Sequence, residues 1–166
     1  MEHHQTPLKE KHTFGDFLYW VLVLSVPLVT AAIAMFQASP AWFILYLIAA
    51  AGLGLIVMRV FCSHCPHYTT GSKTLRCMFL WRIPKLFQER PGPLKMWEKA
   101  ITLAAGAVLF LLLPLPGLLE RPALLTVYIL SLAVFLFSVR RHECVRCTFT
   151  ECPSNRVPHE SRGEVS

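Results

Sequence analysis

The chain has 166 residues, of which 54% are hydrophobic, and its mean hydropathy is +0.48. Lys and Arg outnumber Asp and Glu by 16 to 10, yet these charges are kept out of four long apolar runs. The separation excludes an ordinary soluble enzyme, a secreted disulfide-bonded domain and a nucleic-acid-binding protein that relies on its basic charge. It predicts an all-α membrane protein with four transmembrane helices.

The order of these runs predicts the organisation of the chain. Residues 1–13 are polar and lack an apolar period, which is typical of a flexible tail. The charge-free runs are residues 17–36, 41–58, 100–119 and 122–139. Each is close to the roughly 20 residues that a helix needs to cross the hydrocarbon core. We predict two tandem transmembrane hairpins at 14–61 and 100–139, with a cytoplasmic Cys/His loop at 62–99 and a cytoplasmic Cys-containing tail at 140–166.

Residues inside the runs predict how the helices pack and what they lack. Small residues at 49–54 and 104–107 are expected to face neighbouring helices, because they let backbones approach. Pro114 and Pro116 are expected to end or bend the third helix near the outer interface. No His, Asp, Glu, Lys or Arg interrupts any run. This absence speaks against an ion-coupled transporter and against a haem held between the helices.

The loop between the hairpins carries an apolar pattern of its own. Apolar residues recur at helical spacings of three and four between Leu75 and Phe87, with basic residues beside them. The pattern predicts an amphipathic helix lying in the headgroup layer, divided into two short pieces by Pro84.

The basic residues predict the orientation. Fifteen of the sixteen Lys and Arg residues lie in the N-terminal tail, the central loop and the C-terminal tail, and only Arg121 lies on the other side. Basic residues accumulate on the cytoplasmic side of membrane proteins. We therefore expect an integral plasma or inner membrane protein with both termini in the cytoplasm, in contact with the lipid bilayer. No nucleic acid is expected as a partner.

All six cysteines fall on this basic side, in two similar sets. Cys62 and Cys65 follow the second run, and Cys144 and Cys147 follow the fourth. Each Cys-x2-Cys pair is preceded by an Arg three residues upstream and followed by one further cysteine, Cys77 or Cys152. The arrangement predicts a duplicated unit in which two cysteine pairs lie at equivalent depths.

Paired Cys-x2-Cys motifs predict metal or cluster binding, because this spacing lets two sulfurs converge on one cation. An iron–sulfur cluster prefers four thiolates, which Cys62, Cys65, Cys144 and Cys147 would provide. Zinc is the alternative cofactor, because it accepts mixed sites. The full set of candidate ligands is Cys62, Cys65, Cys77, Cys144, Cys147, Cys152, His64, His67 and His142. The Cys-Pro pairs at 65–66 and 152–153 resemble the end of the cysteine run in bacterial ferredoxins.

Three functions are compatible with these features. The first is an iron–sulfur-type electron-transfer or membrane-anchor subunit that exchanges electrons with a cytoplasmic protein partner or a quinone. The second is a structural zinc protein whose metal shapes a docking surface, and the third is thiol-redox or soft-metal chemistry. No catalytic residue is assigned, and a non-catalytic subunit is favoured over a stand-alone enzyme. Glu143 and Glu151 are expected to stay solvated, and Asn155 is expected to be a turn residue.

Overall fold

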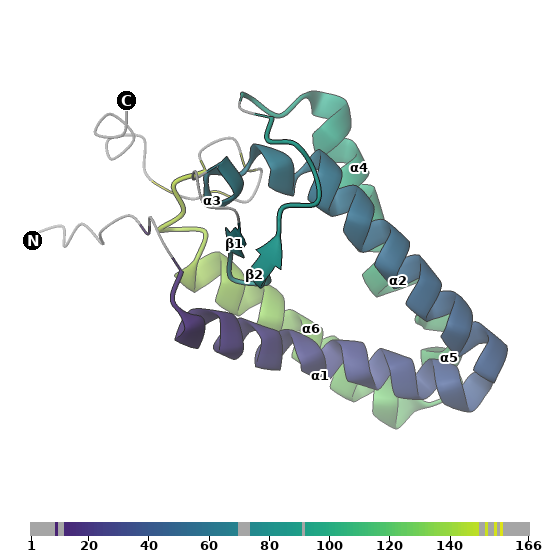
Figure 1. Cartoon of the computed structure of the whole chain (residues 1–166). Helices are drawn as coiled ribbons and strands as arrows, with labels where there is room; N and C mark the ends of the chain where they lie inside the picture. The colour runs from purple at the N-terminus through teal and green to yellow at the C-terminus, as the bar shows by residue number, and fades with distance from the viewer. Residues whose placement is uncertain are drawn as a thin grey trace, which may run out of the picture.

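Four long apolar helices dominate the computed structural model of the chain (Figure 1). The structure describes residues 9, 12–69, 74–90, 92–149, 152, 155 and 157. Within them, the stretches long and apolar enough to cross a membrane are Phe14–Ala38, Pro40–His64, Met96–Leu119 and Pro122–His142. The prediction of a mostly helical chain with four helices long and apolar enough to span a membrane is therefore confirmed.

The elements follow one another with short connections. In chain order they are α1 (Phe14–Ala38), α2 (Pro40–Val60), η1 (Cys62–His64), α3 (Pro66–Thr69), β1 (Thr74–Arg76), β2 (Trp81–Pro84), α4 (Met96–Ala107), η2 (Val108–Leu112), α5 (Leu115–Leu119) and α6 (Pro122–His142). α1 begins at a capping box in which Thr13 and Asp16 satisfy each other's backbone N–H groups. It ends at Ser39, whose extended backbone turns the chain directly into Pro40 of α2.

α1 is the central helix of the bundle. It packs against α2, α5 and α6, while α2 packs against α4. In Figure 1, α1 runs beside α6 and α2 runs beside α4. The buried cluster where the helices meet consists of Ala31, Ala34, Met35, Tyr46, Leu118 and Tyr128. Many other large apolar side chains of these helices remain exposed, as expected where lipid rather than water is the surrounding solvent.

The third span changes its winding just before Pro114, as the sequence predicts. α4 passes into η2, a π-helical turn in which the Leu113 N–H donates to the Val108 carbonyl at 3.0 Å. Pro114 has no N–H to donate to the carbonyl of Phe110, four residues earlier. The hydroxyl of Tyr128 on α6 donates to that carbonyl instead, at 2.6 Å. A side chain of the fourth span thus satisfies a backbone group that the proline leaves free.

Two helices approach closely at a glycine outside the small-residue stretches. A Cβ at Gly52 or Gly54 would meet nothing within 4 Å, so the prediction that these two face a neighbouring helix is wrong. A Cβ at Gly117 of α5 would lie 2.9 Å from the carbonyl oxygen of Ala34 in α1. Gly117 therefore lets α5 lie directly against the backbone of α1.

Substituting these glycines should have opposite effects. Gly117→Ala must push α5 away from Ala34 and is expected to lower the free energy of unfolding by about 1–3 kcal/mol. Gly52→Ala adds a methyl group in open space and improves helix propensity, so stability should stay equal or rise by up to about 1 kcal/mol. Thermal unfolding midpoints of the two variants in one detergent measure the difference. Equal midpoints would contradict the close approach at Gly117.

The prediction of an interfacial helix between Leu75 and Phe87 is wrong. β1 and β2 form an antiparallel hairpin in which Thr74 is opposite Pro84, with an irregularity before Arg76 pairs with Trp81. Arg82 has a φ of 58°, a left-handed conformation that a helix does not contain. Pro84 is tolerated at the end of the hairpin because its missing N–H leaves no ladder bond unmade. The turn places Cys77 at the tip, where its N–H donates to the Leu80 carbonyl at 2.9 Å.

Candidate metal centre

The first cysteine motif begins where α2 ends. Cys62 lies two residues beyond Val60, and η1 brings the Cys65 N–H back to the Cys62 carbonyl at 3.0 Å. The chain then turns into α3, so that the backbone N–H of His67 donates to the Cys65 sulfur. A hydrogen bond to sulfur stabilises a thiolate. The sulfur of Cys65 is thus already supported by the backbone.

Cys77 has extensive backbone support. It occupies the turn between β1 and β2, and the N–H groups of Phe79, Met78 and Leu80 all donate to its sulfur. Successive backbone N–H groups that converge in this way form an anion-binding concavity. This feature depends on the hairpin, because a continuous helix would direct these N–H groups at carbonyls of the preceding turn.

The second motif repeats the geometry of the first. Cys144 lies two residues beyond the end of α6, as Cys62 does beyond α2. The Phe149 N–H donates to the Cys147 sulfur, two residues on, as the His67 N–H does to Cys65. The loop that follows is held by Asn155, whose amide nitrogen donates to the carbonyls of Cys147 and Phe149 at 2.9 Å each. Asn155, which the sequence predicts to be a turn residue, closes the turn at Cys152 and links two parts of the loop.

Sulfurs of the two motifs lie near one another, as their effects on each other's pKa indicate. Burial raises the pKa of Cys65 above its usual value, and the nearby thiols of Cys77, Cys147 and Cys62 raise this pKa further, while the His67 N–H lowers it. Burial also raises the pKa of Cys77 and of Cys147, which are likewise near each other. It raises the pKa of Cys144 to about 11. These thiols therefore lie near one another and are protonated at neutral pH; Cys144 is buried, and Cys65, Cys77 and Cys147 are half-buried.

The three candidate histidines lie in different surroundings. His64 places Nδ1 3.1 Å from the Val60 carbonyl and Nε2 3.8 Å from Glu98, so both ring nitrogens face oxygen atoms. The ring of His67 is buried, 4.7 Å from that of His12. His142 is exposed on the last turn of α6.

The expectation that Glu143 stays solvated is wrong. Its side chain is 11% exposed and binds groups from the beginning of the chain: Lys9 Nζ at 3.0 Å and the indole N–H of Trp20 at 2.9 Å. His12 Nδ1 lies 3.9 Å from its other oxygen. Burial and the neighbouring His67 lower the pKa of His12 to about 4, so this ring is neutral at neutral pH. Glu151 lies outside the described residues.

The beginning of the chain is held against the second motif. The Lys9 N–H donates to the Arg146 carbonyl at 2.8 Å, and Lys9 forms a parallel bridge with Cys147. Its Nζ also contacts Asp16 at 3.1 Å. The residues described at the end of the predicted tail thus have partners: Lys9 and His12 lie beside Glu143, and Thr13 caps α1. Lys9 and the second motif lie far apart in the chain, so the sequence gives no local signal for these contacts.

A second buried carboxylate lies behind the first motif. Glu98, in the first turn of α4, is 0% exposed and accepts the Lys95 N–H at 2.9 Å. Its Oε1 lies 3.2 Å from Arg90 Nη1, and its Oε2 lies 3.8 Å from His64. Sequence reasoning missed Glu98. Its one signal is its place three residues after the helix start, where a carboxylate commonly caps the backbone.

The donor set fits a metal thiolate centre in its chemistry. Sulfurs that receive backbone N–H groups are characteristic of such centres, because these bonds stabilise the deprotonated ligand. Among the residues that the structure describes, no three His, Cys, Asp or Glu side chains already converge closely enough to hold one metal ion. The sulfurs lie near one another, but they would have to move closer together to bind one metal ion.

Comparison of the chain with protein-family models, curated proteins and solved structures gives no match. The function is therefore inferred from the site.

Proposed function

We propose that this chain is an integral membrane metal-binding protein with a thiolate centre at the cytoplasmic surface. The observation that carries the proposal is the backbone support of Cys65, Cys77 and Cys147, which come from both motifs and lie near one another. An isolated buried thiol has no need of N–H donors, whereas a metal thiolate is stabilised by them. The favoured cofactor is an iron–sulfur cluster.

The proposed ligand set contains Cys77 in place of Cys144, which the Cys-x2-Cys spacing alone suggests. Cys62, Cys65, Cys77 and Cys147 interact with one another and would provide four thiolates, whereas Cys144 interacts with Cys147 and Cys152. Four thiolates match the ligand set of common iron–sulfur clusters. When bound, a cluster supplies one-electron transfer. The protein's own residues would hold the sulfurs, which are half-buried.

The equivalent positions of the two motifs support a duplicated hairpin unit. Each first cysteine lies two residues past a transmembrane helix, and each second cysteine accepts the N–H two residues further on. The basic residues at this end of the bundle favour the cytoplasmic side. A centre in this place would exchange electrons with a soluble protein or with a quinone in the membrane.

Structural zinc is the second candidate. The contacts that tie Lys9 to Cys147 and Glu143 favour it, because a metal here would hold together segments from both ends of the chain. Thiol-redox chemistry is less well supported. Burial raises the pKa of Cys65, Cys77, Cys144 and Cys147, and a protonated thiol is a poor nucleophile.

Metal analysis of protein purified without oxygen tests the proposal. We expect iron and acid-labile sulfide in equal amounts, with a brown colour that dithionite bleaches. Zinc without sulfide would select the structural candidate. Protein that is folded by circular dichroism, yet holds neither metal after purification and reconstitution, would contradict both.

A further inference from the structure

A basic cavity lies beside the first cysteine motif, at the polar end of α2. Its volume is about 650 Å³, and its lining residues are Arg59, Val60, Leu86, Phe87, Gln88, Arg90 and Trp97. Two arginines therefore line a space whose other walls are mostly apolar. Arg59 lies in the last turn of α2 and Trp97 in the first turn of α4, so both stand where a spanning helix meets the headgroup layer.

The walls of this cavity are held in place by the surrounding fold. The buried hydroxyl of Tyr68 donates to the Phe87 carbonyl at 2.7 Å and accepts the Phe87 N–H at 2.9 Å. The guanidinium carbon of Arg59 lies 5.8 Å from the centre of the Phe87 ring. The Arg90 N–H donates to the Ser63 carbonyl at 3.0 Å, which ties this side of the cavity to the cysteine motif.

The chemistry of the lining selects the class of ligand. Glu98 neutralises part of the charge of Arg90, but its carboxylate is fully buried and does not line the cavity. Arg90 is still 45% exposed, and Arg59 is exposed beside it. Guanidinium groups bind phosphate through paired hydrogen bonds. The exposed Leu86 and Trp97 provide apolar contact for the parts of a lipid next to its phosphate.

We propose that this cavity binds the phosphate headgroup of an anionic phospholipid, with Arg59 as its main ligand. A quinone ring is neutral and would offer no anion to Arg59. Free phosphate would leave the apolar walls uncovered. The proposal does not depend on whether the cysteines bind a metal.

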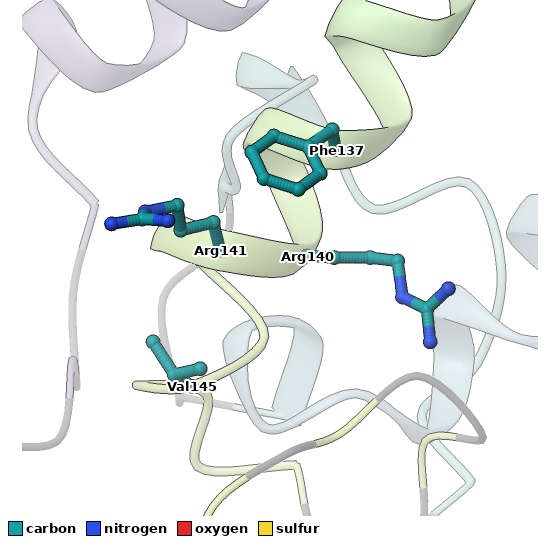
Figure 2. A pocket seen from close by; sticks show the side chains of 4 residues that line it. All are labelled: Phe137, Arg140, Arg141 and Val145. Carbon is teal, nitrogen blue, oxygen red and sulfur yellow. The ribbon is translucent and has the colours of Figure 1, made fainter.

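The second hairpin has a weaker counterpart of this cavity. Figure 2 shows Phe137, Arg140 and Arg141 near the end of α6 and Val145 in the loop beyond, lining a space of about 370 Å³. Arg141 precedes its first cysteine by three residues, as Arg59 does. The two guanidinium groups in Figure 2 point away from each other. They therefore do not provide a paired phosphate site, and we place the proposal at Arg59.

Native mass spectrometry of the detergent-solubilised protein tests the site by lipid titration. We expect the wild type to bind the first phosphatidylglycerol more tightly than phosphatidylcholine. Arg59→Gln should weaken phosphatidylglycerol binding about fivefold, the factor that one arginine contributes near an anionic surface. The matched control is Arg82→Gln, which removes an exposed arginine of β2 that lines neither cavity and should leave binding unchanged.

Leu86→Glu provides a second variant that does not depend on the first. Leu86 is 55% exposed, so a carboxylate there is tolerated by the fold but repels a bound phosphate. It should weaken phosphatidylglycerol binding more than phosphatidylcholine binding. Equal affinity of the wild type for both lipids, or equal losses in Arg59→Gln and Arg82→Gln, would overturn the proposal. Inorganic phosphate that displaces the lipid at millimolar concentration would show that the lipid's apolar parts are not recognised, and would also overturn it.

Discussion

Replacing Cys65 by serine is expected to weaken metal binding by more than the roughly 10–100-fold that a change outside the ligand set typically costs. Cys65 is the sulfur that interacts with Cys62 and Cys77 of its own half and with Cys147 of the other half. A serine hydroxyl stays protonated at neutral pH and is a poor ligand for the soft metals that thiolates bind. Iron, sulfide and zinc contents per chain, measured after identical reconstitution, report the loss.

Serine variants of the other cysteines distinguish two ligand sets. If the centre is held by Cys62, Cys65, Cys77 and Cys147, Cys77→Ser should be as damaging as Cys65→Ser, and Cys144→Ser should retain metal. If the two Cys-x2-Cys pairs alone hold the centre, Cys144→Ser should lose metal and Cys77→Ser should retain it. Full metal content in Cys65→Ser, in protein with the wild-type circular dichroism spectrum, would contradict a centre at this place.

Arg90→Ala is expected to lower the free energy of unfolding by about 2–3 kcal/mol. The substitution leaves the carboxylate of Glu98, which is 0% exposed, without the cation that lies 3.2 Å away. Breaking a fully buried ion pair costs about 3–5 kcal/mol, and the half-exposed position of Arg90 places this pair below that range. Unfolding of the purified protein in detergent, followed by circular dichroism, measures the change.

Removing the charge of Glu98 should recover most of this loss. In the double variant Arg90→Ala/Glu98→Gln, the amide keeps an oxygen for the Lys95 N–H but needs no cation. Glu89→Gln breaks the exposed ion pair with Lys85 at the same end of the molecule and should cost less than about 1 kcal/mol. A double variant no more stable than Arg90→Ala would show that the ion pair is not the cause.

The transmembrane helices could be predicted because their signal is local and strong. A run of about 20 apolar residues without charge has few alternatives to a spanning helix. The interruption of the α-helix before Pro114 was equally predictable, since the missing N–H acts on the residue's own helix. The hairpin around Cys77 was not, because apolar residues at spacings of three and four also arise in two short strands joined by a turn. In this hairpin Arg82 has a left-handed backbone and the N–H groups after Cys77 face its sulfur, and the residue spacing predicts neither feature.

The candidate site was predictable in its residue types but not in its arrangement. Cys-x2-Cys spacing identifies the cysteines, whereas the proximity of Cys65 to Cys147 depends on how α1, α2 and α6 pack. The burial of Glu143 likewise depends on Lys9 and Trp20, more than a hundred residues away in the chain. Spacing in a single sequence carries no information on such contacts.

The contact between Lys9 and Glu143 joins residues separated by 134 positions, and this distance has a consequence for biogenesis. Cys62, Cys65 and Cys77 emerge from the ribosome before the third and fourth helices, while Cys147 and Glu143 follow the last one. The early residues therefore lack their later neighbours until α6 and the loop after it have been synthesised. Completion of the cysteine-rich end thus depends on synthesis of α6, and a chain truncated before α6 would carry only the first cysteine motif.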